Sequence, residues 1–302
     1  EVHTADERLT FIAELESSLL DFDDLGPFIG MPPSTGKGET VSEEQAQQAA
    51  AQKQSSKMIP DDNFDLTKLR EADAQVKLRA KKVLAPDLPI DDLFVDLQLK
   101  DGVLKMQPLK FGLANGELDS QIVMDANEEK IKWDYDVKLR EFRLDEFMRS
   151  QTLKDAVGGQ LGGRIQMSSV GNSMHETAAN GNGRMEMVLA GGRLSNLAIE
   201  LIGLDVAESL GLLISGSERS VPLRCAVGDL IIEDGQLSSR ILVVDTSDTR
   251  INGELAANLE TERFQLRIEP KPKDPSLFSS RTPINVQGSF KDISVRPDVG
   301  NL

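Results

Sequence analysis

Apolar and polar residues alternate along many short stretches of this chain, which is the period of a β-strand with one buried face. The clearest stretch is 131–139, where every second residue is apolar and the residues between them are charged. The same alternation recurs from 7–17 to 284–290. Because an antiparallel sheet can pack one face and leave the other in water, the pattern predicts a mainly β protein with a one-sided sheet.

Seven short motifs punctuate these stretches, and each has a turn-forming residue, then Gly, then an apolar residue two positions after the Gly. Gly allows the positive φ angles of a tight hairpin turn, and the apolar residue starts an inward-facing strand. We therefore expect a hairpin turn at each motif, within one long antiparallel meander. The seven dipeptides are Asp101-Gly102, Asn115-Gly116, Gly162-Gly163, Asn182-Gly183, Gly191-Gly192, Asp234-Gly235 and Asn252-Gly253.

Helices are predicted at only a few places. Acidic residues open short helices at 21–25 and 144–148, where carboxylates can cap the amide groups of a first turn. Apolar residues three and four positions apart predict one longer amphipathic helix near 197–213. At Pro108 the strand alternation slips by one position, which predicts a β-bulge or an edge strand. The Gly-, Asn- and Ser-rich stretch 168–182 predicts a flexible hairpin end.

Composition divides the chain into three parts. Residues 1–28 carry a strand and a short helix, and we expect them to continue a missing N-terminal part, because the chain begins without Met. Residues 29–62 are poor in large apolar residues and rich in Pro, Ala and Gln, which predicts a disordered low-complexity linker. Residues 63–302 carry the remaining strands and are expected to form one β-groove domain.

The net charge of the chain excludes some classes of binding partner. A formal net charge of −16 argues against binding to nucleic acid and against adhesion to an anionic membrane surface. The most hydrophobic stretch, 197–213, contains Glu200, Asp205 and Glu208, so it cannot cross a bilayer cheaply. Membrane attachment is therefore expected only through a segment absent from this chain.

The residues that usually carry chemistry form no recognisable site in the sequence. Cys225, the single cysteine, alternates with apolar neighbours and is predicted to be a small buried strand residue rather than a catalytic thiol. His3 and His175 have no nucleophile at a motif spacing and are predicted to be solvated. The glycines of 158–163 lack the Lys-Ser/Thr of a phosphate loop, and the carboxylates of 21–24 fit a helix cap better than a metal site. We predict no enzyme, no metal and no cofactor.

Six segments follow one another in a recognisable order. They are LLDFDDL at 19–25, FDLTKL at 64–69, LKDGVL at 99–104, NGEL at 115–118, FRLDEF at 142–147 and EDGQL at 233–237. Taken in this order, they resemble the C-terminal region of AsmA-family proteins, and the resemblance covers nearly the whole chain.

The resemblance implies a fold and a function. AsmA-like proteins of Gram-negative bacteria are anchored in the inner membrane by an N-terminal helix and extend into the periplasm. Their long antiparallel sheet curls into a U-shaped groove or open barrel with an apolar interior. Phospholipid acyl chains are expected to slide along that groove between the inner and outer membranes while head groups stay in water. The expected partners are thus a phospholipid or other acyl-chain lipid, together with envelope proteins.

If such a groove exists, the period-two apolar residues are its predicted lining. The same residues would also line an ordinary dry sandwich core, and a scaffold that docks envelope proteins without carrying lipid is the alternative function. The predicted lining residues are Leu93, Val95, Leu97, Leu104, Met106, Ile122, Met124, Trp133, Tyr135, Val137, Leu139, Ile165, Met167, Met185, Met187 and Leu189.

Overall fold

The structure, a computed structural model, is mainly β, as the alternation predicts. Within the residues it describes, sixteen strands belong to one sheet and the helices are short. The described residues are 2–5, 8–21, 57–61, 63–64, 66–84, 90–147, 157–194, 221–273 and 283–297.

The strands are β1 Val2–Ala5, β2 Arg8–Ser17, β3 Leu20–Asp21, β4 Ala72–Leu84, β5 Ile90–Lys100, β6 Val103–Leu113, β7 Gly116–Asp125, β8 Lys132–Arg143, β9 Val157–Val170, β10 Asn182–Leu194, β11 Val221–Glu233, β12 Gln236–Thr246, β13 Thr249–Asn258, β14 Arg263–Pro272, β15 Ile284–Ser289 and β16 Ile293–Pro297. The helices are α2 Leu66–Glu71, the single 3₁₀ turn η2 Leu144–Phe147, and α4 Met174–Ala179.

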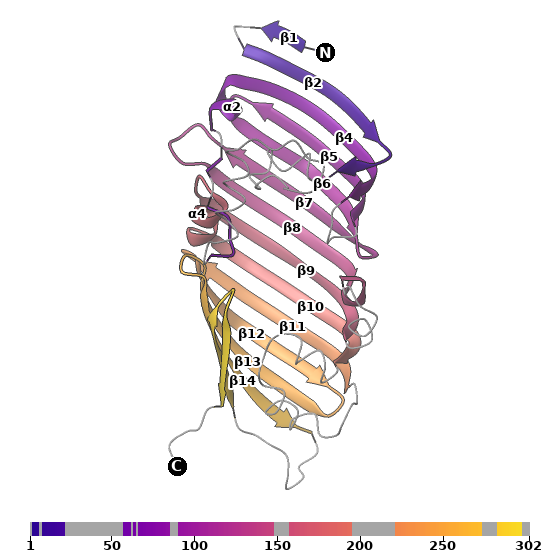
Figure 1. The fold of residues 1–302 in the computed structure, drawn as a ribbon, viewed down its shortest axis with the longest axis vertical. Helices are drawn as coiled ribbons and strands as arrows, with labels where there is room; N and C mark the ends of the chain where they lie inside the picture. The colour runs from indigo at the N-terminus through magenta and orange to yellow at the C-terminus, as the bar shows by residue number, and fades with distance from the viewer. Residues whose placement is uncertain are drawn as a thin grey trace, which may run out of the picture. The chain divides into compact units, whose positions relative to one another are not determined.

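Hydrogen bonding follows the order of the chain, from β1 through β2 and β4 to β16 (Figure 1). No described strand joins β16 back to β1, so the sheet is open. The predicted antiparallel meander is confirmed, with one exception: β2 and β3 pair with β4 in parallel. The strands on either side of the segment 29–62 are therefore direct neighbours.

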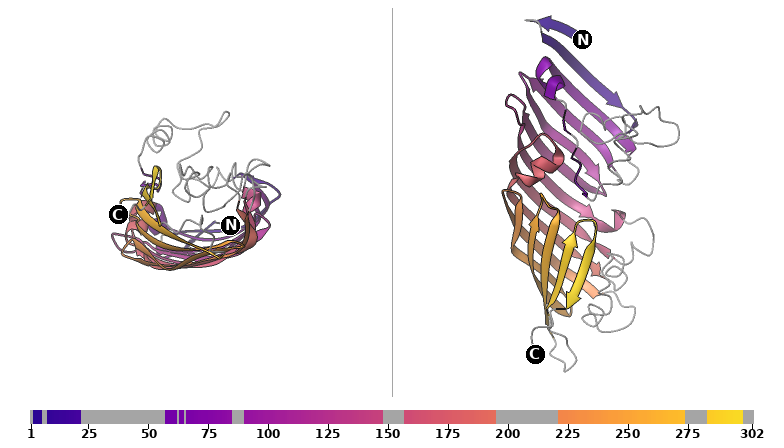
Figure 2. Two further views of the ribbon diagram at one scale, coloured as in Figure 1. Left: turned by 90° about the horizontal axis from the view of Figure 1, so that it is seen from below. Right: turned by 60° about the vertical axis from the view of Figure 1, so that its left-hand side comes forward.

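The chain divides into two compact units, and in each of them the sheet is curled rather than flat (Figure 2). Unit 1 comprises Glu1–Leu113, Glu117–Val137 and Gln166–Asn182, and unit 2 comprises Ala114–Gly116, Lys138–Ile165 and Gly183–Leu302. An open, curled sheet agrees with the fold class predicted from the sequence.

Two of the seven Gly motifs are hairpin turns, as predicted. Asp101-Gly102 joins β5 to β6 with φ angles of 50° and 74°, and Asp234-Gly235 joins β11 to β12 with 46° and 69°. Paired positive φ angles match the twist of the flanking strands, which explains the Asp-Gly sequence at both turns. At Asn115-Gly116 the turn lies one residue earlier than predicted, because Ala114 and Asn115 take the positive φ angles.

The other four motifs are not hairpin turns, and there the prediction is wrong. They are Gly162-Gly163 inside β9, Asn182-Gly183 at the start of β10, Gly191-Gly192 inside β10 and Asn252-Gly253 inside β13. The reason is clearest at Gly253, where a Cβ atom would lie 2.7 Å from Cδ2 of Leu242 on the neighbouring strand. Glycine there makes room for a cross-strand side chain instead of turning the chain.

The expectation of a flexible hairpin end at 168–182 is also wrong, because this stretch contains α4. Ser173 is its N-cap, and its hydroxyl accepts a hydrogen bond from the backbone N–H of Glu176 at 3.0 Å. The Glu176 carboxylate in turn accepts one from the backbone N–H of Asn172, also at 3.0 Å. The Ser-x-x-Glu spacing is a helix-start signal that was present in the sequence.

The slip predicted at Pro108 is a β-bulge. Pairing of β5 with β6 passes from Val95 opposite Leu109 to Leu97 opposite Met106, so β6 uses one residue more than β5. The bulge keeps Met106 and Leu109 on one face although they are three positions apart.

One of the predicted helices is present, and the remaining predictions lie wholly or mostly outside the described residues. The helix predicted at 144–148 is present as η2. The amphipathic helix near 197–213 lies outside the described residues, as does nearly all of the helix at 21–25. Of the linker 29–62, only residues 57–61 are described.

Candidate functional site

In unit 1 the strand register gathers the period-two residues onto one face of the sheet. Directly paired residues share a face, and Val95 of β5 pairs with Leu78 of β4 and Leu109 of β6. Leu97 of β5 pairs with Val76 of β4 in the same way. We call this surface the apolar face of unit 1. On β4 to β6 it comprises Val76, Leu78, Leu93, Val95, Leu97, Leu104, Met106 and Leu109.

The part of this face on β7 and β8 is covered by the chain itself. Trp133 is 5% exposed, and its indole Nε1–H donates a hydrogen bond to the carbonyl of Gly171 at 2.9 Å. The ring of Phe64 packs against Trp133 with centroids 5.1 Å apart, and Tyr135 stacks on Trp133 at 5.5 Å. Apolar side chains of α2 join the same cluster. Burial raises the pKa of Tyr135 above its usual value.

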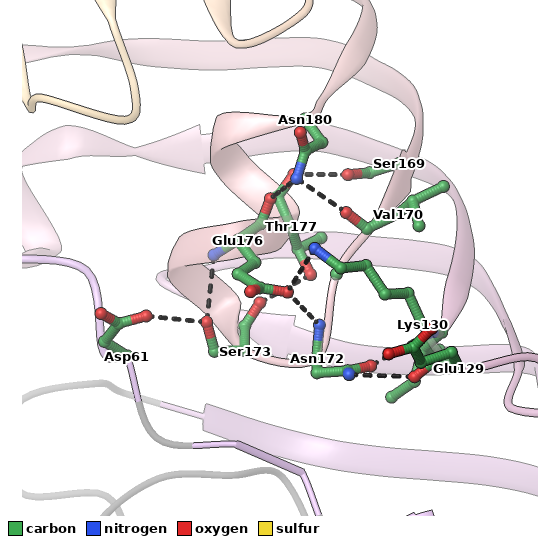
Figure 3. A network of polar contacts seen from close by, with 12 residues as sticks. Asp61, Glu129, Lys130, Ser169, Val170, Asn172, Ser173, Glu176, Thr177 and Asn180 are labelled. Carbon is green, nitrogen blue, oxygen red and sulfur yellow. Dashed lines mark hydrogen bonds and ion pairs between the residues drawn. The ribbon is translucent and has the colours of Figure 1, made fainter.

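A strap, residues 57–61 and 63–64, leads into this cover and is attached to α4 (Figure 3). The hydroxyl of Ser173 donates a hydrogen bond to the Asp61 carboxylate at 2.9 Å. This bond joins residues that are 112 positions apart in the sequence. The strap is therefore held by a tertiary contact that its composition does not reveal.

Around the N-terminus of α4, hydrogen bonds and an ion pair form a polar network that also includes residues just before the start of β8 (Figure 3). The backbone N–H of Phe64 donates to the carbonyl of Asn172 at 2.8 Å. The side-chain oxygen of Asn172 accepts from the backbone N–H of Ile131 at 3.1 Å. Lys130 forms an ion pair with Glu176 at 3.5 Å. The network therefore fixes the strap and α4 beside the start of β8.

The middle of the apolar face of unit 1 is less covered than its ends. Near the other strand ends lies a second buried cluster, which comprises Ala80, Val83, Ile90 and Leu93. Between the two clusters Val76, Leu97 and Met106 are half-buried. At the β2 edge Phe11 and Leu15 are each 48% exposed, and their β4 partners belong to the same face. A contiguous apolar surface of this kind marks an interaction site more often than a scattered apolar residue does.

Unit 2 has an apolar face of its own, which runs over β10 to β15. Leu189 on β10 pairs with Ala226 on β11. Leu255 on β13 pairs with Leu266 on β14, which in turn pairs with Val286 on β15. The side chain of Val286 is 3% exposed, whereas Leu255 and Leu266 are half-buried.

All of the predicted lining residues lie on described strands, and their burial is uniform apart from three of them. Leu93, Met124 and Trp133 are buried, and the other thirteen are half-buried. The structure gathers them into two sets, one in each unit; that they contact a ligand stays a prediction. Those in unit 2 are Leu139, Ile165, Met185, Met187 and Leu189, and the remaining ones are in unit 1.

Sequence reasoning left out further residues of the same faces. Val76 and Leu78 on β4, and Leu255 and Leu266 in unit 2, are half-buried on the apolar side of their strands. Their alternation was visible in the sequence. Their face could not be assigned, because a bulge reverses which parity of residues points to a given side.

Three cavities are present in the described residues, and the second of them is bordered by Leu255, Leu266 and Val286 of the apolar face of unit 2. Their volumes are about 600, 1090 and 300 Å³, and polar residues or glycines contribute most of their lining. Leu93 is the one predicted lining residue that borders any of these three. A ligand on the middle of the apolar face of unit 1 would therefore lie on an open surface rather than in one of these cavities.

Charges on β10 to β12 lie on the opposite face and are paired there. Arg184 donates two hydrogen bonds to the carboxylate of Asp229, at 2.8 and 3.1 Å. This contact with Arg184 holds the pKa of Asp229 below its usual value. Asp229 is opposite Glu186 in the ladder, one position from Met187. The ion pair thus joins strands without placing a charge on the apolar face of unit 2.

Two expectations about single residues need revision. Cys225 lies on β11 as predicted, but it is half-buried rather than fully buried. His175 is not solvated: it lies on α4, is 6% exposed, and its Nε2 is 2.8 Å from Nζ of Lys57. The helix that Ser173 caps is what carries His175 toward the strap.

No helix among the described residues is long and apolar enough to cross a membrane. The same residues bring together no group of three or more His, Cys, Asp or Glu side chains that could hold a metal. Most of the acidic stretch 21–24 lies outside the described residues.

Comparison with known proteins concerns nearly the whole sheet. The chain is 29% identical over 300 residues to AsmA family protein YhjG of Escherichia coli (strain K12), an alignment that covers 99% of this chain and 44% of that relative. The chain thus spans less than half the length of this curated relative. No solved structure matches. The AsmA family model matches residues 3–242, most of the chain and the strands that carry every predicted lining residue. The resemblance seen in the sequence is confirmed, and the chain belongs to the AsmA family.

Proposed function

We propose that this chain holds phospholipid acyl chains on its apolar sheet faces, as the periplasmic part of an AsmA-like protein that moves lipids between the inner and outer membranes. Membership of the AsmA family supports a role in the cell envelope. The observation that carries the proposal is that the middle of the apolar face of unit 1 is only half-buried. All described strands belong to one sheet, so they supply no second sheet to bury that face.

The chemistry of the face suits acyl chains without selecting among them. Burying a fatty chain contributes about 0.8 kcal/mol per CH₂ group, so a plain aliphatic surface is sufficient for binding. The middle of the face consists of Val, Leu and Met side chains, which offer no hydrogen bond that would fix a chain at one position. A bound chain could therefore slide along the strand-to-strand direction.

The test is a charge placed on the apolar face, matched by the same change on the opposite face of the sheet. Val137→Asp puts a carboxylate among apolar neighbours, where it must be desolvated beside an acyl chain. Val188→Asp makes the same substitution at a residue that is 48% exposed on the other face. We expect Val137→Asp to lose co-purifying lipid and lipid transfer between vesicles, and Val188→Asp to keep both.

Circular dichroism and urea unfolding show whether both variants remain folded. If Val137→Asp is folded and still carries lipid like the native chain, the proposal is wrong. Absence of phospholipid from the gently extracted native protein, measured by mass spectrometry, would equally contradict it.

A scaffold that docks envelope proteins is the second candidate function. Its support is the exposure of Val188 and Ile241, each 48%, on the face of β10 to β12 opposite the apolar face of unit 2. If the chain is a scaffold, the expected results are reversed. Val188→Asp would then weaken binding of the partner protein, and Val137→Asp would weaken it only by lowering the stability of the fold.

A further inference from the structure

One cavity of about 600 Å³ in unit 2 lies where β8, β9, β10 and β11 have their ends. Two arginines, Arg143 and Arg193, border it together with Asp145 and Gln160. Glycines of β9 and β10 form much of the remaining lining. This group of residues differs from the apolar lining considered for acyl chains, and it has no part in the proposed function so far.

The glycines bring two backbones together and leave the cavity unfilled. A Cβ atom on Gly192 would lie 2.0 Å from the carbonyl oxygen of Gly158. Gly192 also has a φ of +109°, which side chains rarely allow. Any side chain at this position would collide with β9, so the cavity depends on glycine here.

The two arginines supply positive charge in a chain whose net charge is −16. Arg143 is held by Asp145 through two hydrogen bonds, at 2.6 and 3.2 Å, which leaves its side chain half-exposed in a defined position. Arg193 is exposed and forms no ion pair or side-chain hydrogen bond with another described residue. An arginine fork with unused donors is suited to a phosphate or carboxylate.

The cavity adjoins the apolar face of unit 2. A Cβ atom on Gly159, which lines the cavity, would lie 2.8 Å from Cδ1 of Leu189. Leu189 is the last of three apolar residues, with Met185 and Met187, that alternate along β10. The apolar stripe of β10 therefore ends next to a glycine that lines the cavity, an arrangement that suits a molecule with an acyl chain and an anionic head.

We propose that this cavity binds the phosphate group of a phospholipid whose acyl chain lies along Met187 and Leu189. The inference rests on the proposed function and deepens it, because it assigns a head-group site and a preference for a phosphate-bearing lipid. Arg193 provides the principal contact, and Arg143, oriented by Asp145, provides the second.

The experiment measures binding of three probes to the full chain: dioctanoyl phosphatidic acid, dioctanoylglycerol and inorganic phosphate. We expect the native chain to bind the phosphatidic acid about tenfold or more tightly than the glycerolipid, which has the same chains and no phosphate. Arg193→Gln should remove that preference and keep binding of the glycerolipid. Arg263→Gln, the same charge change at an exposed residue of β14 far from this cavity's lining, should keep the preference.

The outcomes separate this inference from the proposed function. Equal affinity of the native chain for both lipids, or a preference that survives Arg193→Gln in the folded protein, overturns the head-group site while acyl-chain binding stands. Failure of both lipids to bind overturns the proposed function and this inference with it. Arg193-dependent binding of inorganic phosphate as tight as that of phosphatidic acid would assign the cavity to a free anion instead.

Discussion

Trp133 and Val137 lie on the same strand, at alternate positions of the same apolar stripe, yet their surroundings differ. Trp133 is 5% exposed beneath Phe64, whereas Val137 is half-buried. The difference comes from the strap and α2, which cover one part of the face and leave the rest. A period-two stripe therefore does not tell a packed core from a surface that awaits a ligand. Whether a given part of the stripe is buried depends on the segment that covers it.

The largest expected loss of stability follows from a substitution at Trp133, in the covered part of the apolar face. Trp133→Ala removes a buried ring, its stacking on Tyr135 and its hydrogen bond to Gly171, so the free energy of unfolding should fall by about 3–5 kcal/mol. Val137→Ala removes part of a half-buried side chain and should cost about 1 kcal/mol. Urea unfolding followed by circular dichroism measures both. Similar losses for the two variants would show that both positions belong to one packed core.

The next largest loss of stability is expected when Phe64, which covers Trp133, is shortened and the strand residues are left unchanged. Phe64→Ala should lower the free energy of unfolding by about 2 kcal/mol, because the ring is only half-buried. Trp133 is the chain's one tryptophan, so its fluorescence reports this site alone, and its emission should shift to longer wavelength as water reaches the indole. Phe11→Ala, at an exposed residue of the same face, is the control and should leave the emission unchanged.

A smaller effect tests how the strap is attached. Ser173→Ala removes the N-cap of α4 and the hydrogen bond to Asp61, so stability should fall by about 1 kcal/mol. Hydrogen exchange should quicken in α4 and in the strap, with little change in β4 to β6. Ser168→Ala, an exposed serine on β9, is the matched control. Unchanged exchange in the strap would separate it from α4.

The smallest effect concerns alkaline pH at Tyr135, the chain's one tyrosine. Burial raises its pKa in the folded state above the ordinary 10.0, so the folded state keeps this proton at a pH where the unfolded state loses it. Stability contributed by the neutral phenol is therefore complete below pH 10 and declines as the pH rises above it. Ultraviolet absorbance of the phenolate follows the titration.

Two variants sharpen that measurement. Tyr135→Phe should reduce the alkaline loss of stability, because it removes the ionising group. Phe64→Ala should lower the pKa of Tyr135 toward its ordinary value if the cover is the cause of the burial. An unchanged titration in Phe64→Ala would mean that the sheet alone buries the phenol.

Some parts of the fold follow from sequence alone because their signals are local. The charged residues between the apolar ones at 131–139 identify β8 and its solvent face, and the Asp-Gly dipeptides identify two hairpin turns. Other parts depend on partners far away in the chain. Gly253 looks like a turn residue until Leu242 is seen across the ladder, and His175 looks solvated until the strap is seen against α4.

In the candidate site, too, the sequence predicts the local features and misses the contacts between distant residues. Alternation identified which residues could face inward, since that property is local. It did not show that Trp133 is covered by Phe64, because that contact joins residues about seventy positions apart. Nor did it reveal the arginine-lined cavity in unit 2, because the ends of β8, β9, β10 and β11 must meet before Arg143 and Arg193 border one space.

The parallel pairing of β2 with β4 has a consequence for how members of this family can vary. The chain leaves the sheet after Asp21 and returns at Ala72 beside its own earlier strand, so the intervening length is a closed loop in the thermodynamic sense. Doubling such a loop costs only about 0.6 kcal/mol of closure entropy. Insertions and deletions between residue 21 and the strap are therefore nearly neutral for stability, whereas loss of the strap or α2 would remove contacts with Trp133.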